Sequence, residues 1–196
     1  MRGALPGRLY RYATAGHPGA DGGWIGGYRN APVTAVAAEA GVSTGLIYRH
    51  FPSKAELFVE VLTAAVEHEL RIFEAIAAEP LPAPERLRRA ITAFVRRALA
   101  GPGLAYAFIA EPVDPEVEAE RIRCRRLFGE VFRRIVADGV EAGTFPQQDT
   151  HVAAACIVGA FTEALVGPTA LSRDAHGDED ALVESICVFC LRAAGA

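Results

Sequence analysis

Polar and aromatic residues suited to binding a nucleic acid cluster between positions 43 and 54. Their spacing predicts a short helix over 44–50 whose inner side carries Ile47, with Phe51 closing the same core. The outer side of this helix carries Thr44, Gly45, Tyr48 and Arg49. Such a face could enter the major groove of DNA and contact base edges.

Lys54 adds a group that could bind a phosphate. Phe51 and Pro52 end the preceding helix, and Ser53 can cap a new one, with Glu56 three residues later completing a capping box. Lys54 then stands in the first turn, beside backbone N–H groups that have no partner within the helix. Both would face a phosphate of the DNA backbone.

No group of residues has the spacing of a catalytic or metal site. Four acid or base candidates are each isolated in sequence and are interpreted as surface or helix-cap residues: Glu163, His68, Glu111 and His151. The histidines lack zinc-ligand spacing. Cys187 and Cys190 form a C-x-x-C inside an apolar segment, which favours buried thiols over a redox or metal pair. We therefore expect no catalytic residue, metal or cofactor.

The elements that position the polar cluster form a helix-turn-helix. A first helix over 33–40 has apolar residues at i, i+3, i+4 and i+7, beginning with Val33. Gly41 ends it and supplies the left-handed backbone that a sharp turn needs. Val42 can pack on Ile47, and Ser43 can cap the second helix. The alternative is a plain helical hairpin in an all-α protein.

At these residues the chain resembles the TetR family of bacterial transcriptional regulators, whose pattern is like GY…V..IA..AGVS.G.LY.HF.SK.ELF. The matching residues are Gly27, Tyr28, Val33, Val36, Ala37, Ala40, Gly41, Val42, Ser43, Gly45, Ile47, Tyr48, His50, Phe51, Ser53, Lys54, Glu56, Leu57 and Phe58. The sequence departs from the family at Ala31 and Pro32, where a phosphate-binding Thr is common.

The resemblance implies a role for several residues of this cluster. Thr44, Gly45 and Tyr48 would meet base edges, and Thr34 would approach the wall of the groove. His50 and Lys54 would hold phosphates. Since Gly45 has no side chain and Thr44 offers one hydroxyl, we expect specificity to depend on Tyr48 and on DNA shape.

Residues 1–27 depart from the pattern of the rest of the chain. They hold eight of the 19 glycines and show no helical periodicity, although the family has an amphipathic helix here. Two interpretations stay open: a mistranslated segment from a reading-frame error, which would impair DNA binding, or a natural disordered arm. The expected DNA-binding head is 28–58, and the expected ligand-binding and dimerisation domain is 59–196.

Apolar periodicity predicts six helices after the head, so the fold class is all-α. Their expected ranges are 53–78, 84–99, 104–110, 115–142, 149–166 and 178–194. Six arginines on the fourth of these have Glu neighbours, which favours a salt-bridged surface over a second nucleic-acid patch: Arg121, Arg123, Arg125, Arg126, Arg133 and Arg134.

The body is expected to enclose a cavity for a small apolar ligand. The candidate lining residues are Phe73, Phe94, Tyr106, Phe108, Phe128, Cys156, Phe161 and Thr162, with Glu163 as a further polar point. The helices at 149–166 and 178–194 have apolar faces too wide for one subunit to cover, including the small residue Gly159. This predicts a homodimer through both helices, as the resemblance also implies.

Charge is distributed unevenly along the chain. The formal net charge is −4 in total, yet the first 54 residues are basic and the rest acidic, which fits a basic head on an acidic body, although chance could also produce it. No segment has the pattern of a membrane span or signal peptide, so a soluble, cytoplasmic protein is expected.

Two functions are consistent with these features. The first is a ligand-responsive repressor that binds a palindromic DNA operator as a homodimer. The second is an all-α small-molecule sensor or enzyme with a vestigial head.

Overall fold

A computed structural model describes residues 27–30, 32–39, 41–170 and 178–196. The expectations for residues 1–26 lie outside the described residues. The helices are α2 (Gly27–Asn30), α3 (Val33–Glu39), α4 (Thr44–His50), α5 (Lys54–Ala77), α6 (Ala83–Ala100), α7 (Pro102–Ile109), α8 (Pro115–Glu141), α9 (Thr150–Ala164), α10 (Val166–Thr169) and α11 (Glu179–Ala194). No strand occurs within these ranges, and the predicted all-α class is confirmed.

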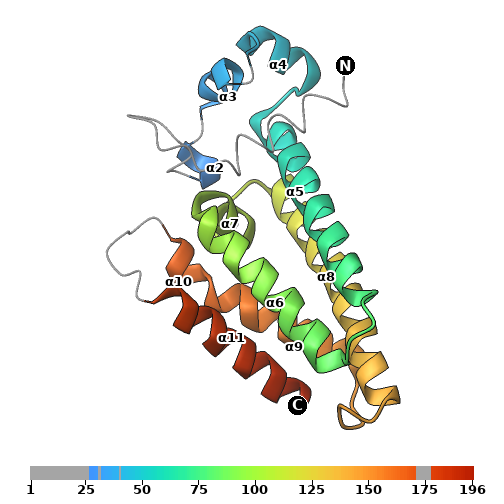
Figure 1. Cartoon of the computed structure of the whole chain (residues 1–196). Coiled ribbons are helices and arrows are strands. Elements are labelled where there is room, and N and C mark those ends of the chain that lie inside the picture. The colour runs from blue at the N-terminus through green and yellow to red at the C-terminus, as the bar shows by residue number, and fades with distance from the viewer. Residues whose placement is uncertain (1–26, 31, 40, 171–177) are drawn as a thin grey trace.

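The helices separate into a small head and a larger body (Figure 1). Helices α3 and α4 pack on each other at one end of the molecule, and α5 runs from that end along the body. Helix α8 packs on both α5 and α9, while α6 packs on α5, α8 and α11. The short helices α2 and α7 contact each other where head and body meet. Helix α5 is thus a continuous connection between the two parts.

Local signals in the sequence determine most helix ends. Gly41 has a φ of 65°, which confirms the predicted left-handed turn between α3 and α4. The Ser53 hydroxyl accepts the N–H of Glu56 at 3.1 Å and so caps α5. Helix α7 differs from the prediction, because it begins at Pro102 rather than at Leu104. Proline is well suited to the first helical position, where its missing N–H has no partner anyway.

The body core is built around phenylalanine rings. Six of them form one connected cluster with centroids 5.0–6.2 Å apart: Phe73, Phe94, Phe108, Phe128, Phe132 and Phe161. A second, smaller cluster holds the head together and includes Val36, Ile47 and Leu57. It also includes Leu104 of α7. The head core therefore continues into the helices that begin the body.

Most arginines of α8 make the ion pairs that the sequence favoured. Arg123 pairs with Glu120, and Arg133 with Glu130. Arg121 corrects the prediction of an exposed face, since it is 3% exposed and donates to the main-chain oxygens of Ala107 and Glu111. Arg121 also pairs with Glu118, as the charge pattern predicted, but that pattern does not reveal its backbone partners at the end of α7.

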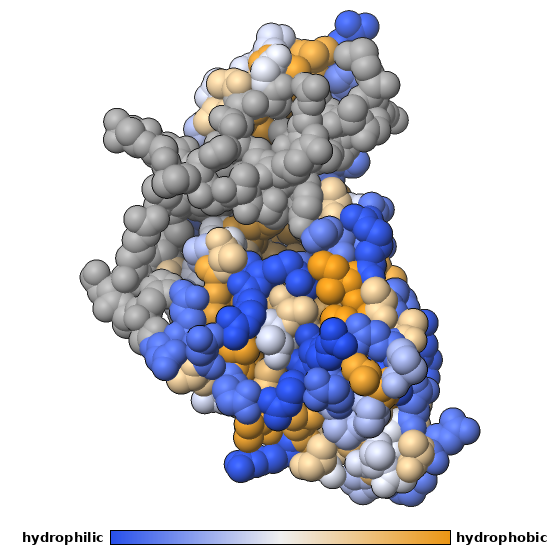
Figure 2. Space-filling view, in the orientation of Figure 1, coloured by the Kyte–Doolittle hydropathy of each residue, from blue (hydrophilic) through white to orange (hydrophobic). Residues whose placement is uncertain are grey.

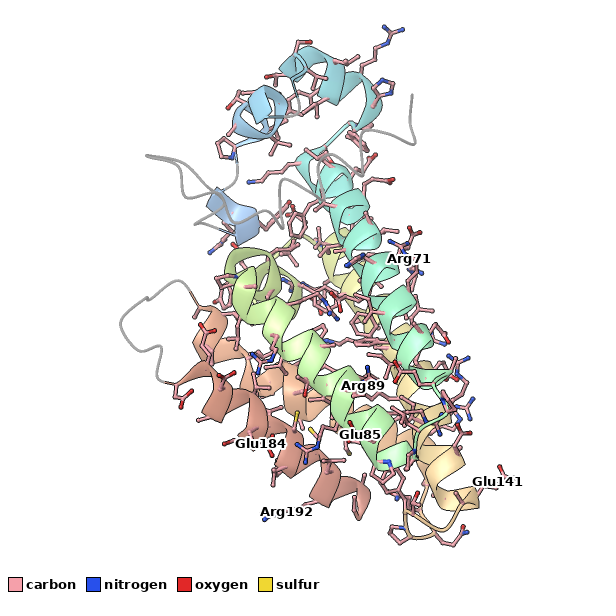
Figure 3. The ribbon with its side chains drawn as sticks, in the orientation of Figure 1. Arg71, Glu85, Arg89, Glu141, Glu184 and Arg192 are labelled. Atoms are coloured by element: carbon pink, nitrogen blue, oxygen red, sulfur yellow. The ribbon has the colours of Figure 1, made fainter. Side chains whose placement is uncertain are left out.

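The outside of the bundle is largely polar. Charged side chains such as Arg71 of α5, Arg89 of α6 and Glu141 of α8 lie on the surface (Figure 3). On the face shown in Figure 2, polar residues of the body are interrupted by smaller apolar patches. Within the described ranges, no helix is both long enough and apolar enough to cross a membrane.

Candidate DNA-binding surface and ligand cavity

Helix α4 presents one side to solvent at the end of the molecule (Figure 1). Ile47 is fully buried against α3 and α5, whereas Tyr48 is 49% exposed and Gly45 and Arg49 are also exposed. Thr44 is half-buried on the first turn. The four predicted outer residues therefore lie on the accessible side of α4. They include the aromatic ring of Tyr48 and the guanidinium group of Arg49.

The other predicted contacts surround this helix. Ser43 is the N-cap of α4, and its hydroxyl accepts the N–H of Leu46 at 3.2 Å. Thr34 is exposed on α3, and His50 is half-buried in the last turn of α4. Because the N-terminal half of α4 is held by Ser43 and its far end by packing, the outer side chains start from a fixed backbone.

Lys54 has partners within the chain that the sequence did not predict. Its Nζ donates to the main-chain oxygen of Arg29 at 3.0 Å and lies 4.9 Å from the centroid of the Tyr28 ring. Burial lowers the pKa of the Lys54 ammonium. The position in the first turn of α5 is as predicted, but the ammonium is directed to α2, which is 25 residues away in sequence.

A buried carboxylate joins the head to the body. Glu111, which is 4% exposed, accepts the N–H of Tyr28 at 2.5 Å and that of Arg29 at 2.9 Å. The Tyr28 hydroxyl donates to Asp114, and its ring lies 4.8 Å from that of Phe58. Burial and the Asp114 hydrogen bond raise the pKa of this hydroxyl well above its usual value. Glu111 is thus a structural acceptor at the junction of α2 and α7.

A cavity of about 420 Å³ lies between α5, α6, α7 and α8. Three of the predicted residues, Phe94, Phe108 and Phe128, are in its wall. Other lining residues are apolar, and they include Leu62, Val66, Leu104 and Ala105. The volume is within the roughly 300–1,000 Å³ typical of small-molecule sites.

Five predicted lining residues lie elsewhere. Phe73 and Phe161 are fully buried in the core cluster, and Tyr106 is half-buried on α7 outside the cavity wall. Cys156 is exposed on α9. Thr162 lines a second hollow between α8 and α9, together with Glu163. Periodicity identifies the inward side of each helix, but it does not show which inward residues pack together and which leave a void.

The second hollow, of about 690 Å³, is less suited to an apolar ligand. Its wall includes the 53% exposed Ile122 and charged residues of both helices, such as Arg126 and Glu163. The first cavity, with its mostly apolar and aromatic wall, is therefore the better candidate for ligand binding.

The polar end of the first cavity was not predicted from the sequence. Glu69 and Arg97 both line it and form two hydrogen bonds of 2.6 Å with each other. The two residues are 28 positions apart and on different helices, so no local spacing connects them. Only the helical face on which each lies could have suggested that they point inward.

The acid and base candidates do not assemble into a catalytic group. His68 lines the first cavity, while His151 and Glu163 line the second hollow. Among the described residues, no cluster of His, Cys, Asp and Glu could hold a metal ion. Burial raises the pKa of the Cys190 thiol to about 11 and also raises the pKa of Cys187. These thiols are buried, as predicted, and protonated at neutral pH.

Two family models match the chain. The model "Bacterial regulatory proteins, tetR family" matches residues 25–61 and so includes α3 and α4. The model "Tetracyclin repressor-like, C-terminal domain" matches residues 80–165. Together they account for more than half of the chain.

A curated relative matches about half of the chain. Nucleoid occlusion factor SlmA from Marinomonas sp. (strain MWYL1) is 29% identical over 97 residues, which are 50% of this chain and 49% of SlmA. The chain therefore spans about half the length of the curated relatives it matches.

Solved structures resemble the whole fold. The fatty acid degradation regulator FadR from Bacillus halodurans has a TM-score of 0.76 and 20% identity, covering 95% of this chain and 94% of FadR. FadR from Bacillus subtilis, solved in complex with stearoyl-CoA, also has a TM-score of 0.76, with 18% identity over 98% of this chain and 99% of that one. Identities this low establish a shared fold only. The two family models and this common fold show that the chain belongs to the TetR family of bacterial transcriptional regulators.

Proposed function

We propose that this regulator is a ligand-responsive repressor that binds a palindromic DNA operator as a homodimer. The observation that carries the proposal is the exposed side of α4, with Tyr48 and Arg49 accessible at the end of the molecule. A helix of this size, held by a second helix across a tight turn, fits the major groove. The head corresponds to the proposed domain 28–58, and 59–196 is the proposed ligand-binding and dimerisation domain.

The proposed DNA contacts divide into two kinds. Thr44, Gly45, Tyr48 and Arg49 would face base edges, while Thr34, Ser43, His50 and Lys54 would contact the wall of the groove and the phosphates. Lys54 already donates to the Arg29 main chain. Its ammonium carries three N–H donors, so it can keep this contact and still donate to a phosphate.

Two substitutions separate these kinds of contact. Lys54→Ala should weaken binding to all DNA sequences about equally. It should also make the slope of log binding constant against log salt concentration shallower by roughly one unit, because one phosphate contact is lost. Tyr48→Ala should instead change the sequence preference. Fluorescence polarisation with the chain's own upstream DNA measures both across a salt series.

Arg71→Ala is the matched control, since Arg71 is an exposed cation of α5 in the body rather than the head (Figure 3). It should leave the affinity unchanged. Wild-type affinity in both Lys54→Ala and Tyr48→Ala would contradict the proposed surface.

The surface of α9 and α11 supports the homodimer. Val152 of α9 is 58% exposed and Phe189 of α11 is 61% exposed, and the two helices pack side by side. Large apolar side chains this exposed on adjacent helices are typical of a surface that another subunit covers. Cys156 and Gly159 are also exposed on α9.

Gly159→Arg tests the homodimer without disturbing the subunit. A Cβ at Gly159 meets nothing within 4 Å, so a side chain can begin there without a clash inside the subunit, whereas a partner packed on this face would exclude a long charged one. Light scattering should show a dimer for the wild type and a shift to monomer for this variant. Ala75→Arg on the exposed surface of α5 should remain dimeric. A monomeric wild type at micromolar concentration would refute the dimer and its palindromic operator.

The ligand is proposed to be small and largely apolar, as the first cavity is. One structural neighbour, FadR from Bacillus subtilis, was solved with stearoyl-CoA, which carries a long apolar chain. Helices α5 and α7 both line the cavity, and both contribute to the head cluster through Val61 and Leu104. A ligand that displaces either helix would change the spacing of the two recognition helices. Operator half-sites are about 34–36 Å apart, so a changed spacing of the recognition helices would weaken binding. A fall in operator affinity on ligand addition would support this coupling.

A further inference from the structure

The first cavity has a polar end, where Glu69 of α5 and Arg97 of α6 face each other, and His68 of α5 is the other polar side chain in its wall. Arg97 Nε donates to Glu69 Oε1 and Arg97 Nη2 donates to Glu69 Oε2, each at 2.6 Å. The Glu69 side chain is 14% exposed and the Arg97 side chain is 33% exposed. The pair is therefore a fixed, partly desolvated element in a wall that is otherwise mostly apolar.

The pair has unused hydrogen-bond donors. A guanidinium group carries five N–H donors, and the bidentate contact uses one from Nε and one from Nη2. Within the described part of the chain, the guanidinium group of Arg97 makes no other hydrogen bond, so both donors of Nη1 and the second donor of Nη2 are available. Both oxygens of Glu69 are already engaged. A bound molecule would therefore meet donors at this end and should supply an acceptor.

The charge of the pair determines which acceptor fits. Glu69 already neutralises Arg97, so the pair carries no net charge. A carboxylate placed against Arg97 would bring a second anion to one cation, inside a cavity whose remaining wall provides little solvation. A neutral carbonyl oxygen accepts the same N–H donors and introduces no charge.

We propose that Arg97 determines ligand specificity in this cavity, and that the cavity selects an apolar molecule with a neutral carbonyl-type oxygen over the carboxylate of equal length. Ketones, esters and thioesters have the required chemistry. Glu69 is a positioning residue, which orients Arg97 and cancels its charge. This inference rests on the proposed ligand-binding function of the cavity.

Three nine-carbon probes test the selectivity on the full chain: nonan-2-one, nonanoate and nonane. Binding is measured by native mass spectrometry and calorimetry at pH 7.5, where a carboxylic acid is ionised. We expect nonan-2-one to bind at least about tenfold more tightly than nonanoate, which corresponds to about 1.4 kcal/mol. It should also bind more tightly than nonane. Equal or tighter binding of nonanoate would overturn the inference.

Glu69→Gln gives the sharpest test, because it leaves Arg97 with an uncompensated charge. The preference should then shift by at least about tenfold towards nonanoate, a change that a merely structural role for the pair does not predict. The double variant Glu69→Leu with Arg97→Leu should no longer bind nonan-2-one more tightly than nonane, since the donors of Arg97 are gone and a buried carbonyl without a donor is unfavourable. Glu74→Gln is the matched control, because Glu74 is on the same helix but pairs with Arg134 at the surface.

The outcomes separate this inference from the function on which it depends. Binding of all three probes with equal affinity would leave the ligand cavity in place and remove the role of Arg97. Failure of all three to bind would overturn both the inference and the proposed ligand site. Circular dichroism confirms that each variant keeps its helical content, so that a lost preference is not a loss of fold.

Discussion

The head and the body of this protein are held together by different kinds of interaction. Helices α3 and α4 bury a few aliphatic side chains, and capping bonds such as that of the Ser43 hydroxyl with the Leu46 N–H fix their ends. The body instead joins its helices through phenylalanine contacts and ion pairs such as Arg88 with Glu184, which are 96 residues apart. The helix ends of the head thus depend mainly on local signals, whereas the packing of the body depends on many distant contacts, so substitutions should affect them differently.

The largest expected effect is in the body core. Phe73 is fully buried and its ring contacts those of Phe94, Phe128 and Phe132. Phe73→Ala should lower the free energy of unfolding by about 3–5 kcal/mol, measured by urea denaturation. Val36→Ala in the head should cost only about 1.6 kcal/mol, from the loss of two methyl groups. Similar losses in both variants would contradict the contrast between the two regions.

A close approach in the body gives the next effect. A Cβ at Gly139 would lie 2.1 Å from Cδ2 of Phe145 and 3.0 Å from the Cβ of Ala83. Gly139→Ala should therefore lower the melting temperature, through a loss of about 1–3 kcal/mol. Gly129→Ala, on the same helix with nothing within 4 Å, should instead stabilise α8 by about 0.5–1 kcal/mol. If the two variants behave alike, Phe145 moves aside easily and the packing is looser than described.

The smallest effect concerns a single capping bond in the head. Ser43→Ala removes the acceptor of the Leu46 N–H and should cost about 1 kcal/mol. Because the bond is local, hydrogen exchange should become faster in α4 while α8 and α9 remain protected. Faster exchange throughout the body would show that head and body unfold as one unit.

The same contrast explains what the sequence could predict. The ends of α4, α5 and α11 follow from capping residues next to them, so their expected bounds agree with the structure to within about one residue. Apolar periodicity also identified Phe94, Phe108 and Phe128 as inward-facing, and these line the cavity. Signals carried by neighbouring residues were sufficient for the fold and for part of the site.

Other features depend on residues that meet only after folding. Glu69 and Arg97 pair across two helices, and Glu111 reaches Tyr28 over 83 residues of sequence. Arg121 pairs with Glu118 as the charge pattern predicted, but its burial was not predicted, because its two other acceptors are backbone carbonyls, which no side-chain pattern records. Cys156 faces outward because the contacts of α9 with α8 and α11 determine which side of this small-residue helix is inward. A single sequence does not show which of these residues meet, or which face inward, after folding.

The Glu111 contact has a consequence for how the head can move. This carboxylate holds two main-chain N–H groups of α2, while its own main-chain oxygen is held by Arg121 at 2.7 Å. A buried carboxylate that loses its donors before reaching water carries an uncompensated charge, at a cost of about 3–5 kcal/mol. Partly displaced positions of the head are therefore disfavoured relative to both the seated and the fully released ones. We therefore expect the Glu111 contact to be either fully made or fully broken when the head moves.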